Sequence, residues 1–264
     1  MAQPLTDTLS GLQRRFGPDA LRRGEGALQA GVWPSGLPVL DGGVLPGGLP
    51  LGRVSVLTGM GPAASGRLTL LQALAARASR SMRVAYLDLN GSLDPGFLAD
   101  LGADLDAMLV LRPRRGELGA GLAMARAVLN AGVPWLGIAF GPGLGRVDSW
   151  SHALTATVEA AHRGRAVVCV SAPAPLAAPL AYASSLTVQC HGAGWQEAHG
   201  DIVGLRVRLT TVKSKLGAPG TDVRVLLRYP RPQAQAEVLG LPAVVGVQQF
   251  PAEPLAPPVA GLAG

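Results

Sequence analysis

The stretch from Gly59 to Leu70, G-M-G-P-A-A-S-G-R-L-T-L, decides the fold of this chain. Gly61 and Gly66 have the spacing of a loop between a strand and a helix, in which backbone N–H groups converge on a phosphate. Such a loop continues with a Lys that reaches the outer phosphates and a Ser or Thr that holds Mg²⁺. Here those two positions are Arg67 and Leu68. Arginine still pairs with phosphate but leucine cannot coordinate a cation, so the stretch predicts a phosphate loop without its catalytic chemistry.

The segments on both sides of this stretch alternate between apolar strands and helices. Apolar runs predict strands at 54–58, 83–89, 108–111, 134–140 and 165–171, and helical spacing predicts helices at 68–79, 95–101, 118–131 and 151–163. This alternation predicts right-handed βαβ units around a largely parallel sheet flanked by helices, which is an α/β fold. Residues 33–53 are rich in Gly and Pro, and they predict no regular structure.

The pattern changes from Leu186 onward, where apolar and polar residues alternate without helices. This alternation predicts antiparallel strands added at the C-terminal side of the sheet, with apolar residues on one side. The opposite side carries four arginines: Arg206, Arg208, Arg224 and Arg228.

We divide the chain into three regions, which are an N-terminal helix and linker (1–31), a core domain (32–230) and a proline-rich tail (231–264). The tail is expected to be disordered or only locally docked. The apolar residues of the first region recur at helical spacing: Leu5, Leu9, Leu12 and Phe16. This stripe fits either the chain's own core or a partner or neighbouring subunit, and both readings stay open.

The composition points to a cytoplasmic protein. Hydrophobic residues make up 48% of 264 residues, but no apolar run reaches the roughly 18 residues of a membrane helix, and no secretory signal is visible. The net charge of +6 favours an anionic partner such as DNA, although a GC-rich genome explains the arginine content equally well. Cys169, Cys190 and the histidines lack ligand spacing, so we expect no metal site.

Four blocks in order resemble the core of bacterial RecA recombinases, over roughly residues 5–230. They read L-Q-R-R-F-G-P-D-A-L-R-R-G-E, P-S-G-L-P-V-L-D followed by G-G-L-P-L-G-R, V-A-Y-L-D-L-N-G-S-L-D-P-G-F, and V-K-S-K-L-G-A-P. The resemblance implies the RecA-like fold of P-loop NTPases. The resemblance implies that the proline-rich tail stands where those proteins have their large C-terminal domain.

The resemblance also implies that the catalytic positions are substituted. Asn90 stands where RecA-like ATPases place the Glu that orients water, and an amide cannot take a proton at neutral pH. The strand that should end in the Walker B acid runs through Phe140 into Gly141 without a carboxylate. Ser171 and Ala172 replace the Asn-Gln pair that senses the γ-phosphate. Together with Arg67 and Leu68, these changes predict that the protein does not hydrolyse ATP.

Some binding positions survive in the resemblance, and each has a structural alternative. Asp94 and Phe97 match residues that hold adenine, but they also suit a helix N-cap and a core aromatic. Lys213 and Lys215 match a pair that reaches a neighbouring subunit's phosphates, but they also suit a solvated strand edge. The residual nucleotide or anion site comprises Gly61, Ser65, Gly66, Arg67, Thr69, Asp94 and Phe97. We expect no required cofactor, and ATP, ADP, phosphate or sulfate bound without hydrolysis stays open.

Two functions follow from the resemblance. The first is an inactive RecA-like scaffold in bacterial DNA repair or damage-induced translesion synthesis, similar to ImuA-type accessory proteins. It would contact RecA, an error-prone polymerase, DNA or copies of itself. The alternative is a divergent ATP-dependent recombinase that uses Arg67 in place of the Walker A lysine.

Overall fold

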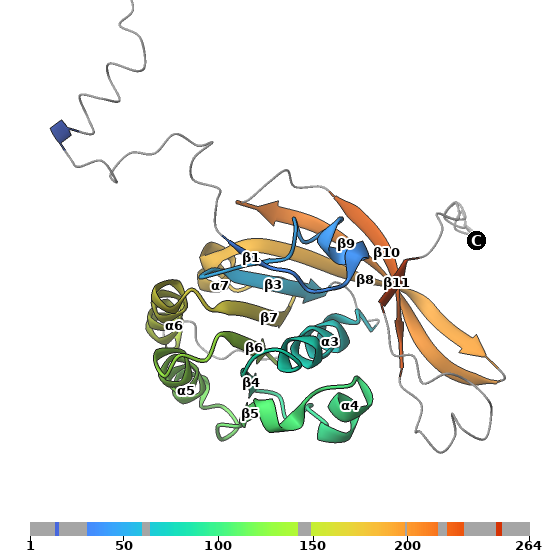
Figure 1. Ribbon diagram of the computed structural model, residues 1–264, viewed down its shortest axis with the longest axis horizontal. Coiled ribbons are helices and arrows are strands. Elements are labelled where there is room, and N and C mark those ends of the chain that lie inside the picture. Colours follow the sequence, from blue (N-terminus) through green and yellow to red (C-terminus); the bar gives the residue numbers. More distant parts are fainter. Residues whose placement is uncertain are drawn as a thin grey trace, which may run out of the picture.

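The computed structural model describes residues 14–15, 31–59, 64–141, 149–198, 200–215, 221–229 and 247–249. Within them, nine strands form one sheet in the order β11-β10-β9-β8-β3-β7-β6-β4-β5 (Figure 1). The strands are β3 (Val54–Gly59), β4 (Val84–Asp88), β5 (Met108–Leu111), β6 (Trp135–Ala139), β7 (Val167–Pro173), β8 (Ser184–Ala198), β9 (Asp201–Ser214), β10 (Asp222–Arg228) and β11 (Val247–Gln249).

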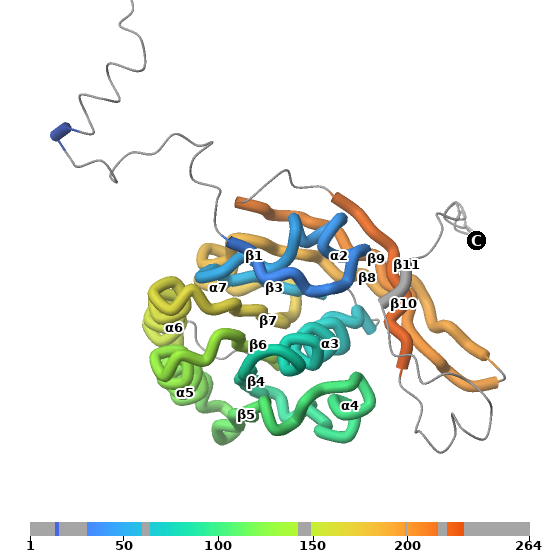
Figure 2. The backbone as a smooth tube through the Cα atoms, in the orientation of Figure 1, coloured from blue at the N-terminus to red at the C-terminus, as the bar shows by residue number. Residues whose placement is uncertain are grey.

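The strands from β8 to β5 are mutually parallel, and from β8 to β11 each strand is antiparallel to its neighbour. The predicted α/β fold with a largely parallel sheet and antiparallel strands at the C-terminal side is therefore confirmed. One detail differs, because β8 runs parallel to β3 and antiparallel only to β9, so it joins the two parts of the sheet. In Figure 2 the β8–β9 hairpin extends beyond the end of β3, away from α5 and α6.

Helices cover both faces of the parallel part. The helices α3 (Arg67–Ser79) and α4 (Pro95–Asp100) bury leucines in one core cluster, which also contains apolar residues of β8, β9 and β10. On the other face, α5 (Leu118–Asn130), α6 (Ser151–Gly164) and α7 (Ala178–Ala183) bury residues in a second cluster. The strands between them are apolar on both faces because both faces are covered.

The prediction of no regular structure for residues 33–53 is wrong. The segment forms β1 (Val32–Trp33), α2 (Pro38–Asp41) and β2 (Leu49–Pro50), with β1 and β2 paired antiparallel. The turn before α2 is held by the Asp41 carboxylate, which accepts hydrogen bonds from the Ser35 hydroxyl at 2.6 Å and from the backbone N–H groups of Ser35 and Gly36 at 3.1 Å. Leu40 and other leucines of the segment are buried, so tertiary packing overrides the turn-forming composition.

The terminal regions lie largely outside the described residues. Of the expected N-terminal helix, only Arg14 and Arg15 are described, and both are helical. Of the expected tail, Val247–Gln249 form β11 against β10, which is a local docking of this segment. No helix in the described ranges is long and apolar enough to cross a membrane.

Candidate functional site

The glycine-rich loop between Gly59 and Arg67 follows the carboxyl end of β3. Its Gly61 lies outside the described residues, which resume at Ala64. Gly66 caps α3 with a φ of 74°, a left-handed angle that favours glycine, and its carbonyl accepts the first helical hydrogen bond from Leu70 N at 2.9 Å. The strand, the glycine turn and the helix therefore follow in the predicted order.

Apolar side chains of the antiparallel strands lie close to the end of this loop. A Cβ added at Gly66 would lie 2.6 Å from Leu227 Cδ1, 2.9 Å from Val207 Cγ2 and 3.3 Å from Leu205 Cδ2. Gly192 of β8 lies directly against the carbonyl oxygen of Ala64, with no room for a side chain between them. Gly66 is thus half-buried against β9 and β10, and β8 lies against the carbonyl group of Ala64, a residue that is otherwise exposed.

Arg67 and Leu68 occupy the positions of the expected lysine and metal-binding hydroxyl. Arg67 is half-buried, and its Nε has no hydrogen-bond partner within the described part of the chain. Burial lowers the pKa of its guanidinium, while the neighbouring Cys190 acts in the opposite direction. Leu68 packs against the core cluster beside α3. Ser65 and Thr69 are half-buried next to them, so the structure brings these four side chains to the start of one helix.

Among the described residues, no carboxylate without hydrogen-bond partners lies at the carboxyl ends of the neighbouring strands. After β4, the Asn90 side-chain oxygen accepts hydrogen bonds from Ser92 Oγ at 2.6 Å and Ser92 N at 3.2 Å, so it closes its own turn. After β6, Phe140 is fully buried with its ring centroid 6.1 Å from that of Trp150. Ser171 is fully buried in β7.

Asp88, a buried carboxylate at the end of β4, is not among the site residues predicted from the sequence. Its oxygens accept hydrogen bonds from the backbone N–H groups of Ser92 and Leu93 and from Arg112 Nε, each at 3.1 Å. Arg112 also donates to the Leu93 carbonyl at 2.5 Å. An acidic residue inside the apolar run V-A-Y-L-D-L was the available signal. The network fixes the turn after β4 and gives Asp88 a structural role there.

Asp94 and Phe97 fit their structural interpretations. The Asp94 carboxylate accepts a hydrogen bond from Gly96 N at 2.9 Å and is the N-cap of α4. Phe97 is partly buried and packs against the core cluster around α3. An adenine-binding role for these two residues stays a prediction.

Lys213 and Lys215 lie together at the end of the sheet that is opposite to the loop. Lys213 Nζ donates hydrogen bonds to the Ala181 carbonyl at 2.6 Å and to Ser184 Oγ at 3.2 Å, and Lys215 Nζ lies 5.9 Å from the centroid of the Tyr182 ring. Burial first, and then the charge of Lys215, lower the pKa of Lys213. Since Ser184 pairs with Val54, the first residue of β3, this pair is at the opposite end of β3 from the loop.

The two cysteines are buried free thiols, as expected from the sequence. Burial raises the pKa of Cys190 to about 12 and that of Cys169 further still. No group of three or more His, Cys, Asp or Glu side chains that could hold a metal ion occurs in the ranges that the structure describes.

Comparisons with known proteins converge on one family. The model of the RecA N-terminal domain matches residues 3–134. The chain is 31% identical to Protein RecA of Lactobacillus acidophilus over 131 residues, which are 48% of this chain and 35% of that protein. It is 34% identical to Protein RecA of Acholeplasma laidlawii over 133 residues, or 49% of this chain and 39% of that protein. The matched part thus spans little more than a third of these relatives' length.

Proposed function

The chain belongs to the RecA N-terminal domain family, and from this we propose that it is a RecA-like protein without ATPase activity that binds a protein partner in bacterial DNA repair. The fold is the RecA-like α/β fold, and we propose a function for this fold in the present chain. The partner we propose is RecA or an error-prone polymerase, in damage-induced translesion synthesis, with self-association and DNA binding as further parts of the role.

The packing at Gly66 is the observation that carries the proposal. Leu205, Val207 and Leu227 lie against the backbone at the end of the loop, which supports a structural role for this loop. Phosphoryl transfer depends on positioned charges and a metal ion. Leu68 is a core contact and Asn90 closes its own turn, so neither supports that chemistry.

The strand at the end of the sheet supports a protein partner. Among the described residues β5 is the last strand beyond β4, so one of its edges carries unpaired backbone groups. Leu109 and Val110 on this strand are 49% and 37% exposed. An exposed apolar edge strand is a template for strand addition from another chain. We therefore assign the partner-binding surface to β5.

A hydrolysis assay tests the missing activity. The purified chain is incubated with radiolabelled ATP and Mg²⁺, with and without single-stranded DNA, and we expect no release of phosphate above the buffer control. Turnover that Arg67→Ala abolishes would overturn the proposal in favour of the divergent recombinase.

Calorimetric titration tests residual nucleotide binding separately. Because Leu68 stands in place of the hydroxyl that would hold Mg²⁺, any ATP or ADP affinity is expected to be the same with and without Mg²⁺. An affinity that depends on Mg²⁺ would place a metal in the site and contradict the structural role of the loop.

A further inference from the structure

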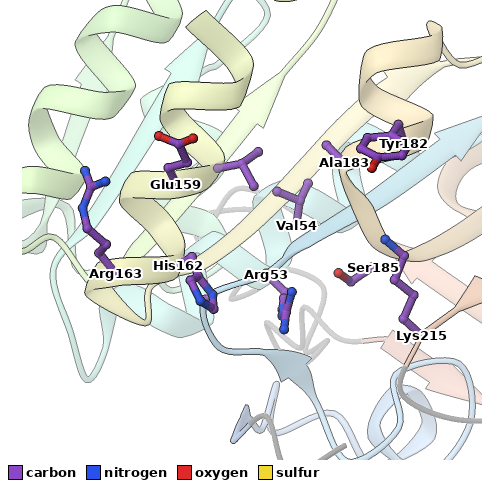
Figure 3. A pocket seen from close by; sticks show the side chains of 11 residues that line it. Arg53, Val54, Glu159, His162, Arg163, Tyr182, Ala183, Ser185 and Lys215 are labelled. Carbon is purple, nitrogen blue, oxygen red and sulfur yellow. The ribbon is translucent and has the colours of Figure 1, made fainter. Parts of the chain in front are cut away.

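A cavity of about 440 Å³ opens near the start of β3, at the end of the sheet that is opposite to the loop (Figure 3). It lies between the start of β3, the last two turns of α6, the junction of α7 with β8, and the residue after β9. Its charged and aromatic lining residues are Arg53, Glu159, His162, Arg163, Tyr182 and Lys215. The volume falls in the range of small-ligand sites, roughly 300–1,000 Å³.

The lining carries an excess of positive charge. Among the described residues that line the cavity, Arg53, Arg163 and Lys215 are cations and Glu159 is the one carboxylate. In the part of the chain that the structure describes, none of these cations forms an ion pair. In Figure 3, Arg53 lies between His162 on α6 and Lys215 beyond β9. Unpaired arginine and lysine side chains at a concave surface favour an anion such as a phosphate.

An exposed aromatic ring stands beside these cations. Tyr182 is 86% exposed, although its neighbours Ala181 and Ser184 are held by the hydrogen bonds from Lys213. These bonds tie the end of α7 to the end of β9, so the ring is presented from a fixed backbone. Lys215 Nζ lies 5.9 Å from the ring centroid, which places a cation and a stacking surface next to each other. A phosphate and an unpaired base together match this combination.

We propose that this cavity binds single-stranded nucleic acid, with a phosphate at Arg53 and Lys215 and a base stacked on Tyr182. The inference rests on the DNA-binding part of the proposed function. It adds where the DNA binds and that the bound DNA is single-stranded. Single strands are favoured over duplexes because duplex bases are already stacked on one another. Binding is independent of sequence, since every base offers a flat face and every nucleotide a phosphate.

Fluorescence anisotropy with a labelled oligo-dT strand tests the inference over a series of salt concentrations. Each lost phosphate contact lowers the slope of log K against log salt by about 0.7 for single strands. The variant Arg53→Ala/Lys215→Ala is therefore expected to bind at least about tenfold more weakly at low salt, with a slope smaller by about 1.4. The control Arg83→Ala/Arg126→Ala removes the same charge from exposed positions outside the cavity and is expected to bind like the wild type.

Tyrosine variants separate the base contact from the phosphate contact. Tyr182→Ala is expected to weaken binding by about 5- to 150-fold without changing the salt slope, and Tyr182→Phe is expected to retain binding. Circular dichroism melting of every variant checks that the fold is intact.

Four results would overturn the inference alone. One is equal loss in the cavity and control variants, which would mean that net charge alone drives binding. Another is equal affinity for duplex DNA together with no effect of Tyr182→Ala. A third is equally tight, Tyr182-dependent binding of a labelled polyglutamate peptide, which would assign the cavity to an acidic protein. The fourth is wild-type binding that no variant changes. Absence of any wild-type binding at low salt would refute the DNA-binding part of the proposed function as well, while leaving partner binding at β5 untouched.

Discussion

Gly66 combines a left-handed backbone angle with close apolar neighbours, so adding a single methyl group there is expected to be costly. Its φ is 74°, and the added Cβ would meet Leu227 at 2.6 Å. We expect Gly66→Ala to lower the free energy of unfolding by about 2–4 kcal/mol, from the left-handed conformation and from overpacking. Urea denaturation measures this change.

Gly116 supplies the matched control for that substitution. Its φ is 85°, but nothing lies within 4 Å of the position of an added Cβ. Gly116→Ala is therefore expected to cost only about 1 kcal/mol, which is the conformational part alone. An equal loss of unfolding free energy at the two glycines would mean that the leucines on β9 and β10 move aside and do not pack tightly against the end of the loop.

At the scale of the element, the turn after β4 depends on one buried carboxylate. The Asp88 side chain is fully buried, while that of Arg112 is 50% exposed. Asp88→Ala is expected to lower the free energy of unfolding by about 3–5 kcal/mol, because the arginine and two backbone N–H groups lose their acceptor. Arg112→Ala is expected to cost less, about 1–2 kcal/mol, because both N–H donors remain on Asp88. Urea denaturation compares the two, with the exposed Arg114→Ala as a control, and a larger loss for Arg112→Ala would contradict this account.

The edge strand β5 gives a prediction about partner binding. Leu109→Lys places a charge on the exposed edge, and we expect it to abolish binding to RecA or to the error-prone polymerase of the same bacterium, since charged edges resist strand addition. Surface plasmon resonance with each purified partner measures the loss, and sedimentation measures self-association. The control is Val212→Lys on β9, because both residues are 49% exposed. Equal binding by the two variants would exclude β5 as the partner surface.

Elements with a strong apolar pattern are predictable from the sequence, and short ones are not. The strand at Met108–Leu111 is predicted with both of its ends, and Arg112 bounds its apolar run on the C-terminal side. The helices α2 and α7 lie in Pro-rich segments, and their local sequence does not favour a helix. They form because Leu40 and Leu180 are buried in the two core clusters, which only the complete fold can provide.

At the scale of the whole molecule, catalysis in this fold would need groups from several strand ends at once. We therefore expect the variant Arg67→Lys/Leu68→Thr to show no ATP hydrolysis, although it restores the two missing loop residues. Phe140 and Asn90 still supply no acid to hold Mg²⁺ or orient water. The radiolabelled assay measures turnover, and melting curves check the fold, because Leu68 contributes to the core. Turnover in this variant would mean that another residue supplies the missing carboxylate.

The sequence predicts the composition of the candidate site better than its arrangement. Ser65, Arg67 and Thr69 do lie together, because a helix start fixes their spacing. The separation of Lys215 from the loop could not be predicted from one sequence, because it depends on β8 pairing with the first residue of β3. The roles of Asp88 and Lys213 could not be predicted from the sequence either. Both side chains bind backbone groups, and hydrogen bonds to backbone groups leave no pattern in the sequence.

The position of β3 in the sheet has a consequence for the order in which the chain can fold during synthesis. Both neighbours of β3, which are β7 and β8, lie later in the chain than residue 134, where the family match ends. A nascent chain that has emerged only to that point holds β4 paired with β5, while β3 has no partner strand. The strand that precedes the phosphate loop is therefore completed late, after β8 has left the ribosome. Until then its apolar edges are exposed to other chains, which makes the nascent protein a candidate client for chaperones.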